Sequence, residues 1–598
     1  MAWYDNAVFY HIYPLGLCGC AHENDGQPVP GAFKKLDAWA EHATKLGCTA
    51  IYIGPLFESG SHGYDTIDYR LVDRRLGTNE EFKEFVAACH ERGQKVIVDG
   101  VFNHVGRDFF AFQDLKANRE NARYKDWFCD VNFWGNNEYN DGFSYDNWGG
   151  YNLLVKLNQK NPAVVDYICD VIRFWVSEFD VDGIRLDAAD VLDFDFMKAL
   201  RRTANEVKPD FWLMGEVIHG DYSRWVNGET LHSVTNYTLH KALYSGHNDH
   251  NYFEIAHTVR RLQNMGTLKL YNFVDNHDVE RIYTKLTNKA HFAPVHVLLY
   301  TLPGVPSIYY GSEFGIEGRK EYGSDDSLRP ALNIEDYKDS VKTNPCTALI
   351  AALGKVRQAV PALSYGSYDE LMLTNRQFAY ARDLDGTRVI VSVNNDDAPA
   401  RMHLAAGNCA AYIGALSGEK VSVQDGHINI TQPANSGEIW VPEGTDLNVK
   451  PVKAQGVNVE NTNSINTNIE ASSVDTEKAT DMVVEDTQSE TTKAEDTKAA
   501  APKAETTKTA SENTASETTA KESESESTPN ATASDNPADP ETITVDWSKS
   551  PESMTVPELQ AAVLAKLSGN GPVDAQMKKT VTDNIWHDSL VNWLKSFR

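Results

Sequence analysis

Short apolar runs recur through the first 360 residues, and polar or glycine-containing segments bound each of them. Apolar runs bounded in this way predict buried β-strands. The chain has eight of them, at residues 7–14, 50–54, 95–102, 181–187, 211–216, 232–237, 269–278 and 305–311. The pattern therefore predicts an eight-stranded core.

Segments with the apolar spacing of an amphipathic helix lie between several of these runs. They cover residues 33–46, 79–92, 162–178 and 194–207. Strands that alternate with helices in this order are typical of a parallel barrel with its helices outside. We therefore predict the α/β class and a (β/α)8 TIM barrel over residues 1–360.

Two later segments depart from this alternation. Residues 105–160, between the third and fourth strands, are polar and rich in Trp, Tyr, Asn and Gly. A connection of that length predicts a small inserted subdomain. From 361 to 448 the pattern changes to short alternating strands, which predicts a C-terminal all-β domain.

The remainder of the chain has a different composition. Residues 451–540 contain no Phe, Trp or Tyr, and they hold 18 acidic and 7 basic residues. Because such a segment buries too little apolar surface to offset chain entropy, we predict a disordered acidic linker over 449–545. Residues 546–598 are amphipathic again and predict a small helical module, with one helix after Thr555 and a second from about residue 573. This module is a candidate for docking an unidentified partner.

Charge and cysteine content narrow the function classes. The chain has 85 acidic and 56 basic residues and a formal charge of −29, which argues against nucleic acid as a partner. No apolar run is long enough to span a membrane, and no secretory signal precedes the first strand. The eight cysteines are too sparse for a disulfide scaffold. We therefore expect a cytoplasmic protein.

Polar clusters follow four of the predicted strands. They are Asp99 to His104, Arg185 to Asp187, Gly215-Glu216 and Asp275 to Asp278. In a barrel of this kind, polar residues at the carboxyl ends of strands form the active site. A single carboxylate there could equally cap the next helix. Several carboxylates, two histidines and an arginine at one mouth predict a catalytic site.

Paired carboxylates in a cleft of this kind suit glycoside hydrolysis, which needs one protonated and one ionised group. Arg185 and Asp187 are two residues apart on a strand, so their side chains point to the same face. We expect the guanidinium to keep Asp187 ionised. Glu216 has apolar neighbours in the sequence, and we expect desolvation to raise its pKa. Spacing alone leaves the two roles open.

The four segments "DGVFNH", "GIRLDAADV", "GEVI" and "FVDNHD" resemble, in this order, the signature segments of the alpha-amylase family, glycoside hydrolase family 13. The resemblance covers roughly residues 3–445. It implies that Asp187 is the nucleophile, Glu216 the acid/base and Asp278 the third carboxylate. It also implies a substrate-binding set, in which a tyrosine stacks on a sugar ring, two histidines bind sugar and an arginine supports the nucleophile: Tyr64, His104, His277 and Arg185.

Further motifs resemble one branch of that family, and this resemblance implies the substrate. "LLVKLN" from Leu153, "NHDVERI" and "IYYGSEFGIEG" resemble the neopullulanase, cyclodextrinase and maltogenic-amylase branch. The N-terminal β-sandwich typical of the branch has no counterpart before the first predicted strand, and Val217-Ile218-His219 departs from the branch pattern after Glu216. The resemblance implies a retaining hydrolase of α-1,4-glucosidic bonds in maltodextrins. A transglycosylase or sugar isomerase on the same scaffold, or a non-catalytic carbohydrate-binding homologue, are the alternatives.

Calcium is the one cofactor that the resemblance suggests as a possibility. Secreted alpha-amylases bind it through an asparagine at the position of Asn103, and they carry Lys-His where this chain has Asp190-Val191. We predict no metal and no other cofactor, and calcium stays open. The insertion adds three aromatic candidates, Trp134, Trp148 and Tyr151. They form either the core of the subdomain or a stacking surface in the cleft beside Tyr64.

Overall fold

The computed structural model describes residues 2–447 except 267, 268 and 323, and then 449, 451, 452, 549, 554–568 and 594. The chain divides into two compact units, residues 1–490 and 491–598. The first unit contains the predicted barrel, insertion and β domain, and the second contains the C-terminal helix. The predicted linker lies almost entirely outside the described residues.

Eight parallel strands form the central sheet of the first unit, in the order β11-β10-β9-β5-β2-β1-β13-β12. A bridge between Thr235 and Tyr271 joins the two outer strands, so the sheet closes into a barrel. Each strand lies within one of the eight predicted runs. Their bounds are β1 Phe9–Ile12, β2 Ala50–Ile53, β5 Lys95–Gly100, β9 Gly183–Leu186, β10 Trp212–Gly215, β11 Ser233–Val234, β12 Tyr271–Asn272 and β13 Val305–Tyr309. The predicted α/β barrel is confirmed.

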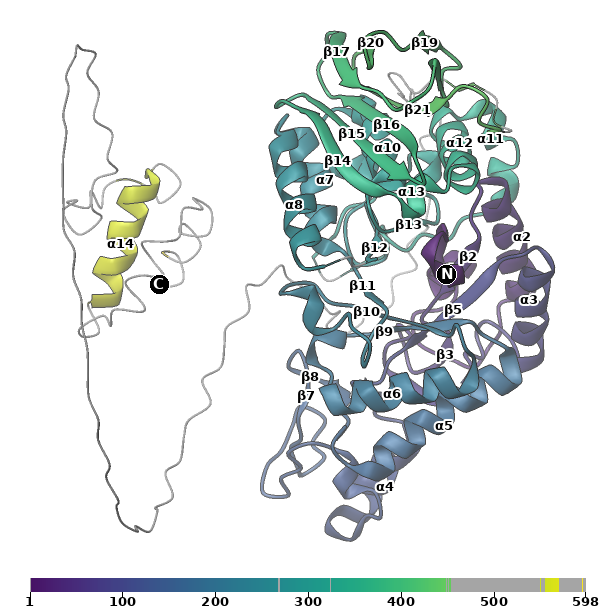
Figure 1. Cartoon of the computed structure of the whole chain (residues 1–598). Helices are drawn as coiled ribbons and strands as arrows, with labels where there is room; N and C mark the ends of the chain where they lie inside the picture. The colour runs from purple at the N-terminus through teal and green to yellow at the C-terminus, as the bar shows by residue number, and fades with distance from the viewer. Residues whose placement is uncertain are drawn as a thin grey trace, which may run out of the picture. The chain divides into compact units, whose positions relative to one another are not determined.

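Helices surround these strands (Figure 1). They are α1 Pro14–Cys18, α2 Ala32–Lys45, α3 Asn79–Glu91, α5 Pro162–Phe179, α6 Phe194–Val207, α7 Tyr237–Asn248, α8 Tyr252–Asn264, α9 Ile282–Lys285, α10 Phe292–Thr301, α11 Ser340–Thr343, α12 Pro345–Ala359 and α13 Ala362–Tyr365. Short 3-10 turns are η1 Trp3–Asp5, η2 Arg119–Asn121, η3 Lys125–Trp127, η4 Ala189–Val191, η5 Tyr222–Arg224, η6 Lys289–His291, η7 Ser312–Phe314 and η8 Ile334–Tyr337. Between β10 and β11 the connection contains only η5 in place of a barrel helix.

Side-chain caps explain where several barrel helices begin. Thr78 accepts a hydrogen bond from the Glu81 N–H at 3.2 Å, and the Glu81 carboxylate accepts one from the Thr78 N–H at 2.9 Å. This reciprocal pair caps α3. Asn161 caps α5 and Asp193 caps α6 through their side-chain oxygens. These helices therefore begin at capping residues that can be recognised in the sequence.

Aromatic rings fill the barrel interior. The rings of Phe9 and Trp212 stack with centroids 5.0 Å apart, and Trp3 packs against both from the amino-terminal end. Tyr52 and Tyr271 belong to the same buried cluster. Because this end of the barrel is filled with apolar side chains, polar groups concentrate at the opposite, carboxyl end.

The segment between β5 and α5 forms the predicted insertion. It contains α4 Phe110–Asn118 and a three-stranded sheet of β6 His104–Val105, β7 Asn147–Trp148 and β8 Tyr151–Lys156. A hairpin of β3 Phe57–Ser59 and β4 Thr66–Val72 follows β2. The aromatic core of the insertion consists of Phe112, Phe128, Phe143 and Tyr145.

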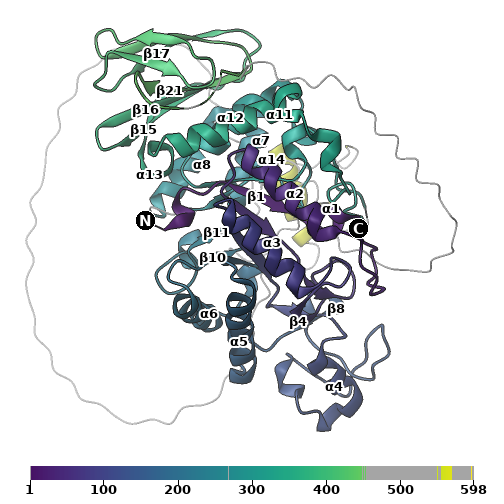
Figure 2. The same ribbon diagram turned by 90° about the vertical axis from the view of Figure 1, so that its right-hand side faces the viewer.

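The β domain follows α13 and lies at the opposite end of the unit from α4 (Figures 1 and 2). Its main sheet has the order β14-β15-β16-β21-β18-β19, and β17 pairs with β20. Its strands are β14 Ser367–Leu373, β15 Gln377–Leu384, β16 Thr387–Asn394, β17 Ala400–Ala405, β18 Ala411–Gly414, β19 Lys420–Ser422, β20 His427–Gln432 and β21 Ser436–Pro442. Gly437 approaches the Val297 side chain of α10 so closely that a Cβ there would clash, at 2.8 Å.

The second unit is described only around α14, Val556–Ser568. This helix coincides with the one predicted after Thr555. It packs Leu559, Ala562 and Val563 with Met554 and Leu594 in a small apolar cluster. The second predicted helix, from about residue 573, lies outside the described residues apart from Leu594.

Candidate active site

The carboxyl ends of the barrel strands bring the predicted carboxylates to one mouth. Asp187 follows β9 and donates its N–H to Gly100 O on β5 at 3.1 Å. Glu216 follows β10 and donates its N–H to Leu186 O on β9 at 2.9 Å. These bonds continue the parallel ladder past the strand ends. The side chains at these positions therefore have a fixed register relative to each other.

Arg185 is the centre of the cluster. Its Nη1 donates to Asp99 Oδ1 at 2.9 Å and to Asp187 Oδ1 at 2.8 Å, and its Nη2 lies 2.7 Å from Glu216 Oε2. The guanidinium is almost completely buried. One cation thus contacts three carboxylates that come from three neighbouring strands.

The surroundings of Asp187 oppose ionisation more strongly than the Arg185 spacing led us to expect. Burial raises the pKa of Asp187 well above its usual value, and the nearby Glu216 and Asp99 raise it further against the opposing effect of Arg185. One guanidinium cannot neutralise three carboxylates, so the excess negative charge favours retention of a proton. Reasoning from the Arg185–Asp187 spacing considered only one of these partners.

The Glu216 carboxylate has polar partners in space besides its apolar neighbours in the sequence. It accepts hydrogen bonds from Ala188 N at 3.2 Å and Tyr237 Oη at 3.3 Å, in addition to the contact with Arg185. Ala188 has φ 45° and ψ 44°, the left-handed conformation that non-glycine residues rarely adopt. This backbone geometry accompanies an amide that donates to Glu216.

Asp278 lies at the end of the segment after β12 and has two basic neighbours. Its Oδ2 is 3.0 Å from His277 Nε2, and its Oδ1 is 3.0 Å from Arg329 Nη2. Burial opposes ionisation, but His277 and then Arg329 lower the pKa of Asp278 well below its usual range. Asp278 is therefore ionised at neutral pH.

Tyr64 lies beside this group and is mostly buried. Its ring is parallel to that of His277, with centroids 5.7 Å apart, and its hydroxyl forms hydrogen bonds with His277 and with Asp99. Tyr52 donates to the same Asp99 oxygen at 2.9 Å. One face of the Tyr64 ring is thus covered by protein. Stacking on a sugar stays a prediction for the other face.

His104 completes the predicted set on the insertion side. Burial, with His62 as a second cause, lowers the pKa of His104 to about 3, so its imidazole is neutral. Its Nε2 is buried and has no hydrogen-bond partner. The Trp148 ring lies 6.0 Å from the His104 ring, whereas Trp134 is 99% exposed. Of these two aromatics, only Trp148 approaches the predicted sugar-binding residues.

Sequence reasoning missed several residues of this site. Arg329 bridges Asp278 and Asp325, and its Nε donates to His277 O at 3.0 Å. Tyr13 stacks on His277 from another segment. Tyr237 contacts Glu216 as described above. Arg329 lies in a loop away from the strand ends. Tyr13 and Tyr237 fall within predicted strand runs, but those runs carry no cluster of charged residues that would have marked them.

The structure allows one test of a calcium site. Asn103 Oδ1 is buried without a hydrogen-bond partner, as an unfilled ligand oxygen would be. Calcium needs six to eight oxygen ligands. Over the described part of the chain, no group of three or more His, Cys, Asp or Glu side chains is placed to hold a metal. The absence of a metal or other cofactor stays a prediction.

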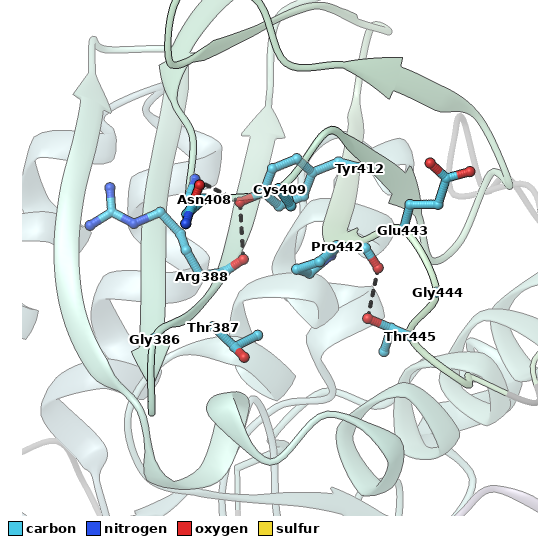
Figure 3. Close-up of a pocket in the computed structure, with 11 residues that line it drawn as sticks. Gly386, Thr387, Arg388, Asn408, Cys409, Tyr412, Pro442, Glu443, Gly444 and Thr445 are labelled. Atoms are coloured by element: carbon cyan, nitrogen blue, oxygen red, sulfur yellow. Dashed lines mark hydrogen bonds between the residues drawn. The ribbon is translucent and has the colours of Figure 1, made fainter.

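A cavity of about 270 Å³ lies in the β domain (Figure 3). Arg388, Cys409, Tyr412 and Glu443 are among the residues that line it. The Tyr412 hydroxyl accepts from Gly407 N at 2.9 Å and donates to Arg388 O at 3.1 Å. None of the predicted site residues lies in this cavity, so we place no chemistry there.

Comparisons with known proteins bear on this arrangement. The family model for the alpha-amylase catalytic domain matches residues 30–355. A cyclomaltodextrinase of a Bacillus species is 31% identical over 431 residues, which cover 68% of this chain and 75% of that protein. The chain belongs to the alpha-amylase family. As a member, it is a glycoside hydrolase.

Two further relatives refine the likeness within the alpha-amylase family. An intracellular maltogenic amylase of Bacillus subtilis is 29% identical over 66% of this chain and 69% of its own length. A solved structure named cyclomaltodextrinase has a TM-score of 0.66 at 27% identity, over 73% of this chain and 78% of that one. The predicted family and the resemblance to its cyclodextrinase and maltogenic-amylase branch are confirmed.

In the part of the chain that the structure describes, no helix combines the length and the apolar character needed to cross a bilayer.

Proposed function

We propose that this chain is a retaining hydrolase of α-1,4-glucosidic bonds in maltodextrins and related α-glucans. The observation that carries the proposal is the shared contact of Asp187 and Glu216 with one guanidinium, at 2.8 and 2.7 Å. A single planar group keeps the two carboxyl groups close. Retaining glycosidases need a separation of about 5–5.5 Å, whereas inverting ones leave room for a water.

In this proposal Asp187 attacks the anomeric carbon while Glu216 protonates the leaving sugar oxygen. A covalent glycosyl-enzyme forms, and Glu216 then activates the water that hydrolyses it. Asp187 must be ionised when it attacks. Because the positive charge that develops on the sugar is the opposite of the charge surplus around Arg185, binding in the transition state favours the ionised form.

The other predicted residues bind the sugar. Asp278 is ionised and held by His277 and Arg329, so it offers fixed acceptor oxygens to sugar hydroxyls. His104 Nε2 and His277 Nδ1 are buried without partners, which supports hydroxyl binding at both. Trp148 supplies the aromatic surface nearest to His104. This assignment explains otherwise costly unpaired atoms.

Maltodextrins are our proposed substrates, and cyclodextrins are the second candidate because the first relative is named for them. A product profile on maltoheptaose, pullulan, a cyclodextrin and sucrose tests both. The first-formed anomer, followed by NMR, should be α. A β-anomer would contradict retention, and a profile dominated by longer products or by sucrose isomers would favour the transglycosylase or isomerase alternative.

We also propose a cytoplasmic location. All eight cysteines lie within the described residues and none forms a disulfide. Unpaired thiols in this number suit a reducing compartment. Fractionation of the source cells with a specific antibody is the test, and recovery outside the cytoplasm would contradict it.

A further inference from the structure

The two oxygens of the Glu216 carboxylate have different partners. Oε2 forms an ion pair with Arg185 Nη2 at 2.7 Å and accepts a hydrogen bond from Ala188 N at 3.2 Å. Oε1 accepts from the Tyr237 hydroxyl. Arginine and a backbone N–H can only donate, whereas a tyrosine hydroxyl can donate or accept. A proton on Oε2 would therefore face two donors, and Oε1 is the oxygen that has room for it.

Tyr237 is itself held by the loop of the third carboxylate. Asn276 Nδ2 donates to the Tyr237 hydroxyl at 3.2 Å. Asn276 Oδ1 accepts from the N–H groups of Asp278 at 2.8 Å and Val279 at 3.1 Å. A chain of hydrogen bonds thus runs from the backbone at Asp278 through Tyr237 to Glu216.

Packing also fixes the Tyr237 ring. It meets the Phe273 ring edge-on, with centroids 4.9 Å apart. The preceding Asn236 accepts from Leu239 N at 3.1 Å and donates to Asn272 Oδ1 at 2.8 Å, which ties the start of α7 to β12. Burial raises the pKa of Tyr237 well above 10, with Glu216 and Asp278 as further causes. The hydroxyl therefore keeps its proton throughout the neutral range.

We propose that Tyr237 is a positioning residue. Its hydroxyl orients the Glu216 carboxyl group so that Oε1 is the oxygen that donates the proton and later takes it back. The inference rests on the proposed acid/base role of Glu216. In the first step the Oε1 proton moves to the glycosidic oxygen while the bond between that oxygen and the anomeric carbon breaks. An oxygen of Asp187 bonds to the anomeric carbon in its place. Tyr237 then donates to the resulting carboxylate. In the second step water bonds to the anomeric carbon, Asp187 departs, and the water's proton returns to Oε1.

The test compares two leaving groups in the full-length chain. Maltoheptaose loses a sugar alkoxide that needs a proton, whereas α-maltosyl fluoride loses fluoride without one. In Tyr237→Phe we expect kcat on maltoheptaose to fall about tenfold or more, with KM little changed, and activity on the fluoride to fall less than about threefold. Tyr222→Phe is the matched control, because its hydroxyl contacts Thr238 Oγ1 and Ile218 O rather than Glu216. It should leave both rates unchanged.

A double-mutant cycle separates positioning from folding. Glu216→Gln should itself cost more on maltoheptaose than on the fluoride, and Tyr237→Phe in that background should cost nothing further. Equal losses on both substrates, or the same loss with and without Glu216, would show that the hydroxyl only supports the fold and would overturn the proposal. If Glu216→Gln shows no dependence on the leaving group, the acid role in the proposed function is wrong, and the proposal falls with it.

Discussion

Two regions of the molecule bury arginine guanidinium groups, and their surroundings are opposite. At the barrel mouth Arg185 contacts three carboxylates. At the junction with the β domain, Arg357 and Arg382 donate to backbone carbonyl oxygens, and no ion pair with either is present among the described residues. Arg357 Nη1 reaches Tyr300 O and Arg382 Nη1 reaches Thr301 O, both at 2.6 Å.

The charge balance differs accordingly. Burial opposes the charge of Arg185, but Asp99 and Glu216 outweigh it and raise its pKa. Burial lowers the pKa of Arg357 to about 9, with Arg382 as the second cause, and burial lowers the pKa of Arg382 to about 10. The carbonyl partners at Tyr300 and Thr301 end α10, where the helix dipole favours a cation.

The difference separates two uses of the same side chain. Around Arg185 three carboxyl groups share one cation, so the cluster favours further positive charge. Around Arg357 and Arg382 only dipoles balance the charge, which suits a permanent joint between helix ends and a sheet. We therefore expect variants in the first region to change activity and variants in the second to change stability.

The largest expected effect comes from the carboxylates around Arg185. Asp187→Asn and Glu216→Gln should each lower kcat on maltodextrin by several orders of magnitude, because the groups act as a unit. Both variants remove surplus negative charge, so neither should unfold the chain. Steady-state kinetics and a melting curve measure the two outcomes. Retention of more than about a tenth of the activity would contradict the assigned role.

The second-largest effect concerns stability rather than activity, at the junction between the barrel and the β domain. Arg382→Met should lower the free energy of unfolding by about 3 kcal/mol, because charge-assisted hydrogen bonds are lost and buried carbonyls stay unpaired. The folded fraction should keep its kcat. Arg388→Met is the control on the same sheet, since its partners Asp383 and Asp369 are partly exposed, and it should cost about 1 kcal/mol or less. Equal costs for the two variants would remove the distinction.

A third pair of variants leaves every arginine in place and tests the rim of the barrel mouth. Trp148→Ala should raise KM for maltodextrin about tenfold, the value of one aromatic contact. Trp134→Ala should change neither KM nor the melting temperature, because that side chain is 99% exposed. An effect of Trp134 equal to that of Trp148 would place substrate on the outer insertion.

The smallest effect concerns the charge surplus itself. Burial and then Glu216 raise the pKa of Asp190 to about 6. The folded protein therefore binds this proton more tightly than the unfolded chain, whose pKa is about 3.9. Stability is lost as pH rises from about 4 to 6 and is constant above.

Asp190→Asn removes this loss. Its melting temperature should match that of the wild type near pH 4 and exceed it above pH 6. Because Asp190 is exposed to solvent, screening keeps the difference small. An advantage for the variant that is larger at pH 4 than at pH 7 would give the wrong sign and contradict the raised pKa.

Local patterns in the sequence were sufficient to predict the barrel. All eight apolar runs contain strands, although β11 and β12 are only two residues long. The four predicted helices agree with the observed ones to within one residue at each end. Short-range periodicity and capping chemistry determine these elements, so one chain is enough to read them.

The electrostatics of the site could not be read in this way. The spacing of Arg185 and Asp187 is local, but the contacts of Arg185 with Asp99 and Glu216 join strands far apart in the chain. Arg329 reaches Asp278 across 51 residues. Charge balance depends on all neighbours in space, and a sequence pattern names only those along one strand.

Among the described residues, one bridge between Thr235 and Tyr271 closes the barrel, which makes the seam between β11 and β12 its weakest junction. On one side of the seam, Tyr237 lies two residues after Thr235. On the other side, Asp278 follows β12. A glucan chain that binds to both Glu216 and Asp278 would therefore link the two sides of the seam and stabilise it. Occupied enzyme would open there less often than empty enzyme, and backbone amides such as that of Asn236, bonded to Tyr271 O at 2.9 Å, would exchange with solvent more slowly.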